Sequence, residues 1–259
     1  MKDQYVGDIG DFGKYGLLKA VCGYDPACPD GYWPLGVVWY RTPDGGPVGD
    51  GKFTGYLDRD DRNYRQCDPA LYDALQGIVR SKQRNVRIIR ERNVLSPGTT
   101  YFEEMLSFDG MPHIGAMAKK RRLAHREQWL QMALAAMTGH RVIFLDPDNG
   151  FASTSHRHHH THGPKYVFFD ELRQFVERDR TIVAYHHIDR TEDAAAQITH
   201  RTAAIQEAVG QCAVRSILYR RGTSRAYFII TNSTDVHVID LRLNAFLDRG
   251  WRQHFELKQ

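Results

Sequence analysis

The segment DPDNG at residues 146–150 holds the residue types best suited to chemistry in this chain. It follows RVIFL (141–145), an apolar run that predicts a buried parallel strand. Ligands of open α/β sheets bind outside the carboxyl ends of the strands, so the segment would lie at that edge. Asp146 and Asp148 would supply carboxylates there and Asn149 an amide, unless the five residues only form a turn. We predict the active site at this segment.

Two histidines, His186 and His187, follow a second apolar run, TIVAY (181–185). If the two runs form neighbouring strands, one imidazole would lie beside Asp146 and Asp148. Imidazole and carboxylates together suit a divalent metal, Mg²⁺ or Mn²⁺, or a general base with electrostatic support. The alternative is that one histidine faces the core and the other caps the next helix.

A third candidate lies near the N-terminus, in GDIGDFGKY (7–15), where Asp8, Asp11 and Lys14 stand among three glycines. A loop of this kind brings backbone amides and charged side chains close to a ligand. The stretch lacks the G-x-G-x-x-G spacing and follows no strand, which excludes a dinucleotide-binding turn. The alternative is a helix capped by Asp11 after a flexible leader.

The glycine-rich segment 42–52 (TPDGGPVGDGK) follows the apolar run LGVVWY (35–40) and suits either a cofactor loop or a plain surface loop. It nearly matches a P-loop, but Phe53 replaces the magnesium-binding hydroxyl, which excludes a nucleoside-triphosphatase. The segment 153–164 is a His-rich insertion that either chelates metal or is simply solvated. The cluster KKRR (119–122) either meets phosphates or begins a solvated helix.

Composition excludes several classes of protein. The 259 residues are 42% hydrophobic and 25% charged, as in ordinary globular proteins, and no apolar run approaches the roughly 18 to 20 residues of a membrane span. A net charge of +4 permits a polyanionic partner without requiring one. The four cysteines form no C-x-x-C pair, which indicates free thiols rather than a zinc ribbon. The N-terminus shows no secretory signal, so we expect a cytoplasmic protein without a membrane partner.

Apolar runs alternate with helical stretches along the chain, which predicts a single α/β domain over residues 1–259. We expect a doubly wound, mostly parallel sheet with helices on both faces and an antiparallel C-terminal strand pair, because the last strands are joined by short loops. The expected strands are 35–40, 86–89, 141–145, 181–185, 215–219, 225–231 and 236–239. The expected helices are 11–22, 68–80, 121–137, 165–178 and 189–209.

These motifs resemble those of class I S-adenosylmethionine-dependent methyltransferases, and most closely the ribosomal RNA adenine methyltransferases of the J type. That family begins with G-N-x-A-D-x-x-K-H-x-x-L, and GDIGDFGKYGLL (7–18) is similar. SPGT (96–99) is similar to its proline-glycine-serine segment, and DPDN (146–149) stands where the family has D-P-P-Y. The chain also resembles uncharacterised bacterial proteins that share the motifs KYGLL and DPDNG.

The resemblance implies a Rossmann-like fold, S-adenosylmethionine as cofactor and a nucleic acid or nucleotide as substrate. Asp146 would accept from the target amine, Pro147 would shape the turn, and Lys14 would lie near cofactor or substrate. Five residues would contact the cofactor: Asp8, Asp11, Asp44, Gly45 and Gly46. The chain departs from the family at Asn149, where the family has an aromatic residue that stacks on a flipped base, and in its first-strand loop.

Three hypotheses about function follow. The first is a methyltransferase-like enzyme that uses Asp146, Asp148, Asn149, Lys14 and His186. The second is a metal-dependent phosphodiesterase or nuclease in which Asp146, Asp148 and His186 or His187 hold Mg²⁺ or Mn²⁺, which activates water. The third is a non-catalytic binding module that kept the fold and lost the chemistry.

Overall fold

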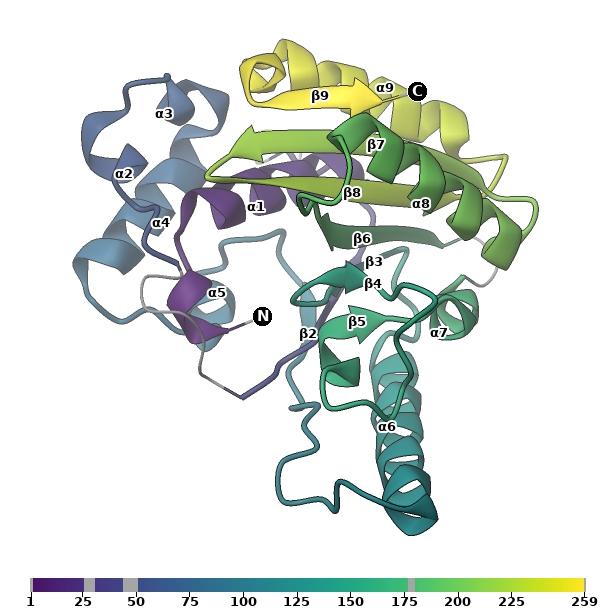
Figure 1. Cartoon of the computed structure of the whole chain (residues 1–259). Coiled ribbons are helices and arrows are strands. Elements are labelled where there is room, and N and C mark those ends of the chain that lie inside the picture. Colours follow the sequence, from purple (N-terminus) through teal and green to yellow (C-terminus); the bar gives the residue numbers. More distant parts are fainter. Residues whose placement is uncertain (1, 26–30, 44–50, 177–179, 259) are drawn as a thin grey trace.

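The computed structural model describes residues 2–25, 31–43, 51–176 and 180–258 (Figure 1). Within these residues, nine strands form two sheets: β1 Leu35–Trp39, β2 Thr100–Phe102, β3 Val142–Asp146, β4 Gly150–Phe151, β5 Tyr166–Val167, β6 Thr181–His187, β7 Ala213–Arg221, β8 Thr223–Thr231 and β9 Phe255–Lys258. The helices are α1 Ile9–Cys22, α2 Tyr56–Arg59, α3 Tyr64–Cys67, α4 Pro69–Arg80, α5 Arg87–Glu91, α6 Ala116–Ala136, α7 Phe169–Phe175, α8 Ala194–Val209 and α9 Val236–Asp248. Three short 3-10 helices are η1 Asp3–Tyr5, η2 Gly163–Lys165 and η3 Trp251–Gln253.

The central sheet has seven strands in the order β2-β1-β3-β6-β8-β7-β9, and β4 pairs with β5 in a separate small sheet. Strands β2, β1, β3 and β6 are parallel, whereas β8 is antiparallel to both β6 and β7, and β9 is antiparallel to β7. Most of the strands therefore run in one direction, with antiparallel strands toward the C-terminus. This α/β arrangement is compatible with a Rossmann-like fold.

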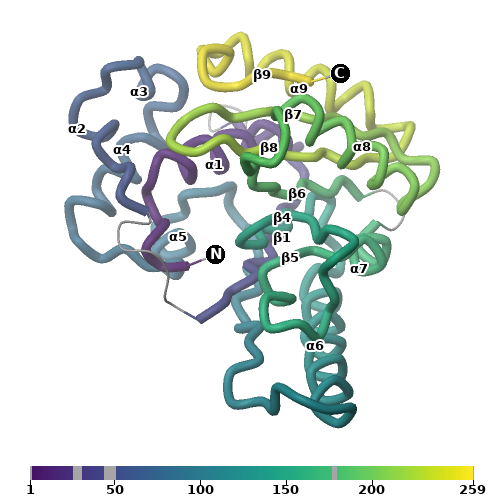
Figure 2. The backbone as a smooth tube through the Cα atoms, in the orientation of Figure 1, coloured from purple at the N-terminus to yellow at the C-terminus, as the bar shows by residue number. Residues whose placement is uncertain are grey.

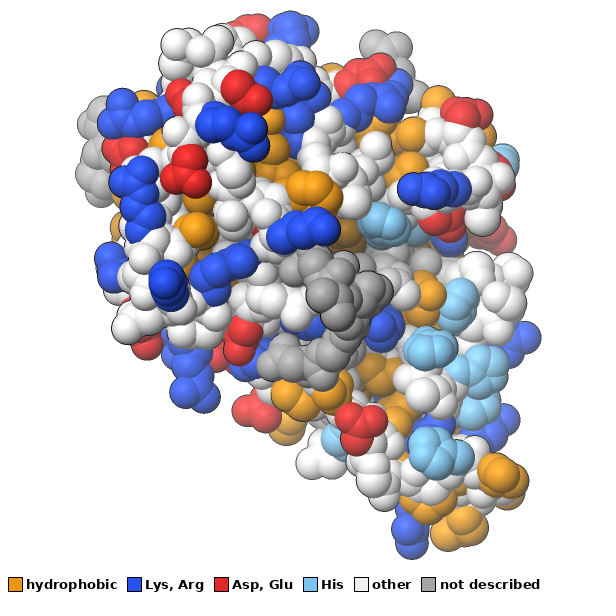
Figure 3. Space-filling model, turned by 60° about the vertical axis from the view of Figure 1, so that its left-hand side comes forward, with side chains coloured by type: hydrophobic (Ala, Val, Ile, Leu, Met, Phe, Trp, Pro, Cys, Tyr) orange, Lys and Arg blue, Asp and Glu red, His pale blue; other side chains and the backbone are white. Residues whose placement is uncertain are grey.

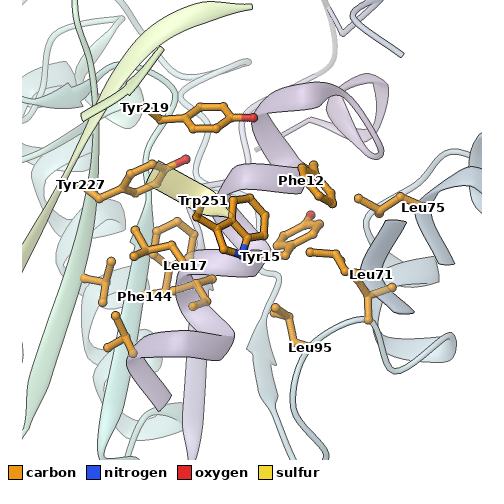
Figure 4. Close-up of a cluster of buried hydrophobic side chains, with 14 of the residues drawn as sticks. Phe12, Tyr15, Leu17, Leu71, Leu75, Leu95, Phe144, Tyr219, Tyr227 and Trp251 are labelled. Atoms are coloured by element: carbon orange, nitrogen blue, oxygen red, sulfur yellow. The ribbon is translucent and has the colours of Figure 1, made fainter. Parts of the chain in front are cut away.

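Helices cover both faces of the central sheet, and each face has its own hydrophobic core. Alternate strand residues separate the two cores, so that Phe144 of β3 belongs to one and Leu145 to the other. The first core packs the sheet against α1, α4, α9 and η3, and Figure 4 shows Phe12 and Trp251 within it. The second core packs the opposite face against α6, α7 and α8. Among the described residues, no helix is both long and apolar enough to cross a membrane.

Helix α1 lies directly on the sheet because small residues face its partners. Asp8 caps its N-terminus by accepting from the amide of Gly10 at 2.6 Å, so the helix begins at Ile9 rather than at Asp11. A β-carbon on Gly13 would lie 2.6 Å from the Tyr219 ring, so a larger residue would push the helix away. The Tyr219 hydroxyl also donates to the carbonyl of Ile9 at 2.7 Å. These contacts fix the first turns of α1 against β7 and β8, and Figure 2 shows the helix passing behind these two strands.

Two predicted strands are helices in the structure. Residues 86–89 belong mostly to α5, where the Asn85 side chain accepts from the amide of Ile88 at 3.0 Å and favours a helical turn. Residues 236–239 begin α9, whose buried positions 239, 243, 246 and 247 have helical spacing that becomes visible only beyond residue 239. A run of four apolar residues does not distinguish a strand from a helix.

The predicted helices differ from the observed ones mainly at their beginnings. Residues 165–178 were predicted as one helix, but their described part holds the end of η2, strand β5 and the shorter α7. Helix α8 begins at Ala194, because Asp193 caps it by accepting from the amides of Ala195 and Ala196. Helix α6 begins at Ala116, five residues before the predicted start, and extends away from the sheet (Figure 1).

Candidate active site

A cavity of about 270 Å³ lies at the carboxyl ends of β3 and β6, beside the N-terminus of α1. Its lining includes these residues of the candidate segments: Asp8, Asp11, Lys14, Gly51, Asp146, Pro147, Asp148, Asn149 and His187. Strand β3 brings the DPDNG segment to this edge, and α1 brings the N-terminal motif across the same face of the sheet. Two of the three candidate segments, far apart in sequence, thus meet in one place, together with one of the two histidines.

The centre of the cavity wall is a buried ion-pair cluster. The ammonium of Lys14 lies 3.0 Å from Oδ2 of Asp146 and 3.1 Å from Oδ1 of Asp11. Burial opposes the charge on Lys14, but the two carboxylates outweigh it and raise its pKa above the usual value. Lys14 therefore stays charged and holds the Asp146 carboxylate in place. The second oxygen of Asp146, Oδ1, has no hydrogen-bond donor among the described residues.

The Asp11 carboxylate accepts hydrogen bonds from two groups and is almost completely buried. Its Oδ2 accepts from the hydroxyl of Tyr15 at 3.0 Å and from the amide of Gly7 at 3.3 Å. Burial raises the pKa of Asp11 to about 6, the carboxylates of Asp8 and Asp146 add to the rise, and Lys14 opposes it. Asp11 consequently changes its protonation just below neutral pH.

The Asp11 pKa predicts a measurable dependence of stability on pH. The folded pKa exceeds the usual 3.8, so between pH 4 and 6 the folded state holds a proton that the unfolded state has lost. This group's contribution to stability is therefore full below pH 4 and is lost as pH rises through 6, by up to about 3 kcal/mol. We expect urea unfolding of wild type minus Asp11→Asn to give a difference that falls from pH 4 to 7. The exposed control Asp109→Asn should give a flat difference, and a flat or rising Asp11 curve would contradict the assignment.

The rest of the DPDNG segment is fixed by its neighbours. Oδ2 of Asp148 lies 3.8 Å from the ammonium of Lys2, 3.7 Å from that of Lys165 and 3.4 Å from the hydroxyl of Thr42. The backbone of Asn149 donates to the carbonyl of Lys165 at 3.0 Å. Asp148 thus joins the ends of β1 and β3 to the N-terminal residues.

The two histidines lie in β6, which extends two residues beyond the predicted strand, and alternation sends them to opposite faces. His187 lines the cavity. His186 packs on the other face, where its Nδ1 accepts from the amide of Phe151 at 3.1 Å. Burial lowers the pKa of His186 to about 3, so the ring is neutral. Strands β3 and β6 are neighbours as expected, yet His186 does not join Asp146 and Asp148.

The described residues contain no group of three or more His, Cys, Asp or Glu side chains arranged to hold a metal ion. The His-rich segment 153–164 fits this finding, because several of its rings pack against neighbours. His156 lies 4.1 Å from the Tyr166 ring, centroid to centroid, and His158 lies 3.8 Å from the Phe168 ring. Figure 3 shows histidines gathered on one side of the molecule, where this segment lies.

Two further sequence candidates are placed only in part. Asp44, Gly45 and Gly46 fall outside the described residues, so their assignment to the cofactor stays a prediction. In the KKRR cluster, three side chains on α6 are exposed, whereas Arg122 is buried. Arg122 donates to the carbonyl of His159 at 3.1 Å and therefore anchors the His-rich segment rather than facing solvent.

Sequence reasoning missed Arg225, Tyr185 and Phe53, which also line the cavity. Tyr185 lies within a predicted strand rather than after its carboxyl end. Strand β8 is antiparallel, so its first residues reach the same edge and carry Arg225 into the site. A charged residue at the start of the apolar run RAYFIIT was the available signal.

Comparison with protein-family models gives no match for this chain, and comparison with curated proteins gives none either. The function must therefore be argued from the cavity itself. Its main features are a buried Lys14–Asp146 pair, the carboxyl group of Asp11 and the guanidinium of Arg225.

Proposed function

We propose that this protein is an S-adenosylmethionine-dependent methyltransferase-like enzyme that modifies an amine of a nucleic acid or nucleotide. The observation that carries the proposal is the Asp146 carboxylate at the end of β3, which Lys14 fixes through Oδ2 while Oδ1 is left without a donor. An amine N–H is the donor that such an oxygen would accept. The antiparallel strand β8 beside β6 also fits the architecture that the motifs imply.

The charges of the cavity suit the proposed cofactor. S-adenosylmethionine carries a sulfonium and an ammonium, both cationic, and a carboxylate. Asp8 and Asp11 supply negative charge at one end of α1, while Arg225 supplies positive charge at the start of β8. These residues would hold the cofactor, which when bound supplies an electrophilic methyl group.

The protein's own groups would prepare the amine for attack. Asp146 would accept a hydrogen bond from the amine, which directs the nitrogen lone pair away from the carboxylate and toward the methyl donor, and would take up the proton that the nitrogen loses. Lys14 would keep the carboxylate oriented, because it is itself held by Asp11 at 3.1 Å. Asn149 lines the cavity where an aromatic residue would stack on a base, so polar contacts would position the substrate.

The test is methyl transfer from methyl-tritiated S-adenosylmethionine to RNA, DNA and nucleotides offered separately. We expect wild-type protein to label one of these classes and Asp146→Asn to lower the rate by about 10² to 10⁴, because the amide accepts no proton. Calorimetry should show that Asp146→Asn still binds the cofactor. The exposed Asp109→Asn is the matched control and should keep full activity. Wild-type protein that binds no cofactor at millimolar concentration would contradict the proposal.

The metal-dependent alternative receives no comparable support from the geometry. The ammonium of Lys14 already lies between the carboxylates of Asp11 and Asp146, where a cation would otherwise neutralise them. The hydrolase and the non-catalytic module stay predictions of the sequence. Cofactor calorimetry separates both from the proposed enzyme.

A further inference from the structure

Arg225 is a buried cation with few partners. Its side chain leaves β8 on the same face as Tyr227, is only 8% exposed and borders the cavity. Its one hydrogen bond is from Nη2 to the hydroxyl of Thr223 at 2.7 Å, and Nε has no partner among the described residues. No carboxylate of the described residues lies within ion-pair distance of it, although the charge of the nearby Asp8 favours its charged form and helps to raise its pKa.

Arg122 and Arg126 are also buried, and the more buried of the two, Arg126, shows what a satisfied guanidinium looks like in this protein. Arg126 forms a two-pronged ion pair with Glu171 and also donates to the carbonyls of Gly163 and Tyr166, each at 2.8 Å. Burying a charge without such compensation is costly, so an unsatisfied buried group calls for an explanation such as a bound water, ion or ligand. Arg225 differs from Arg126 because its guanidinium has neither a carboxylate nor a carbonyl acceptor among the described residues, and it differs from Arg122 because it borders the cavity.

The guanidinium of Arg225 packs against the backbone of α1 at Gly10. A β-carbon on Gly10 would lie 1.3 Å from Nη1 of Arg225, so only glycine leaves the space that the side chain fills. The Tyr219 ring, centred 6.0 Å from the guanidinium carbon, supports it from β7. Contacts with the α1 backbone and the Tyr219 ring thus fix the position of the guanidinium. Several of its N–H groups have no acceptor among the described residues.

We propose that Arg225 binds an oxyanion, a carboxylate or a phosphate, of the molecule that occupies the cavity. The planar fork of arginine matches both groups and binds them through two parallel hydrogen bonds. The inference rests on the proposed function in one respect, the choice of molecules that could supply the oxyanion. These are S-adenosylmethionine, through its carboxylate, and a nucleotide, through its phosphate. The unpaired guanidinium itself stands whether or not methyl transfer occurs.

Calorimetry with four probes separates the two sources. S-adenosylmethionine is compared with its decarboxylated analogue, and adenosine monophosphate with adenosine, on wild type, Arg225→Gln and Arg225→Lys. We expect Arg225→Gln to weaken binding of one oxyanion-bearing probe by about 10- to 100-fold and to leave binding of the counterpart that lacks the oxyanion unchanged. Arg225→Lys, which keeps the charge but loses the fork, should fall between. Arg215→Gln, the same substitution on β7 outside the cavity, should change neither probe.

Each outcome either supports or contradicts the inference. Loss confined to S-adenosylmethionine assigns the carboxylate, and loss confined to adenosine monophosphate assigns the phosphate, even if wild type binds no cofactor and the proposed function fails. Equal losses for a probe and for the counterpart that lacks the oxyanion, or no loss at all, contradict it. So does wild-type protein that binds neither S-adenosylmethionine nor adenosine monophosphate. A thermal melt of each variant checks folding, and the lysine variant keeps the test valid if the glutamine variant unfolds.

Discussion

Replacing Lys14 with methionine is expected to lower the free energy of unfolding by about 3 to 5 kcal/mol at pH 7. The substitution keeps the volume but removes the cation between two carboxylates, each almost fully buried. Asp11 and Asp146 would then repel one another without compensation, a loss larger than that of a surface ion pair. Urea denaturation followed by circular dichroism measures the change, and methyl transfer should disappear with it.

Lys19→Met is the matched control on the same helix. Lys19 pairs with the more exposed Asp68, so we expect a smaller loss, of about 1 kcal/mol. The effect of Lys14→Met should also shrink below pH 6, because protonation of Asp11 removes one of the two charges that Lys14 neutralises. A loss at pH 7 no greater than that of Lys19→Met, or a loss independent of pH, would show that Lys14 does not hold the cluster together.

The second large effect is expected at Gly150, where Ala should destabilise the protein by about 2 to 6 kcal/mol. Gly150 has a φ of +97°, and a β-carbon there would lie 2.6 Å from the Cα of His186. Backbone cannot move aside as a side chain can, so the DPDNG segment or β6 would have to shift. Cofactor affinity should therefore fall together with the melting temperature.

Gly139 offers a control that isolates the backbone cost. Its φ is +80°, yet a β-carbon there would meet nothing within 4 Å. Gly139→Ala should cost about 1 kcal/mol, from the left-handed conformation alone. If the two variants lost similar amounts of stability, the close approach of residue 150 to His186 would not contribute to the cost of the substitution.

Long apolar runs allowed most of the sheet to be predicted from the sequence. Five predicted strands, at 35–40, 141–145, 181–185, 215–219 and 225–231, lie mainly in strands of the central sheet, because a buried strand needs apolar residues. Shorter runs carried too little information, and one of four residues, 86–89, belongs mostly to a helix. Tertiary packing and caps decide such segments.

The sequence predicted the site residues that lie directly after a strand or at the start of a helix. It did not predict those whose position depends on the direction or the exact length of a strand. Asp146 and Lys14 meet because a strand end and a helix start share one edge of the sheet. His186 was misplaced relative to Asp146 because two extra residues of β6 decide which face a side chain takes. Arg225 was missed because only the antiparallel direction of β8 brings its beginning to that edge.

The long-range contacts of α1 have a consequence for folding during synthesis. Its contacts reach far along the chain: Tyr219 donates to Ile9 across 210 positions, and Arg242 donates to Val21 across 221. A ribosome adds about 5 to 20 residues per second, so the first helix waits roughly 10 to 40 seconds for these partners to be made. During that interval the side of α1 that contacts β7 and α9 lacks these partners. The cavity is complete only after Arg225 has been synthesised, because that residue lines it.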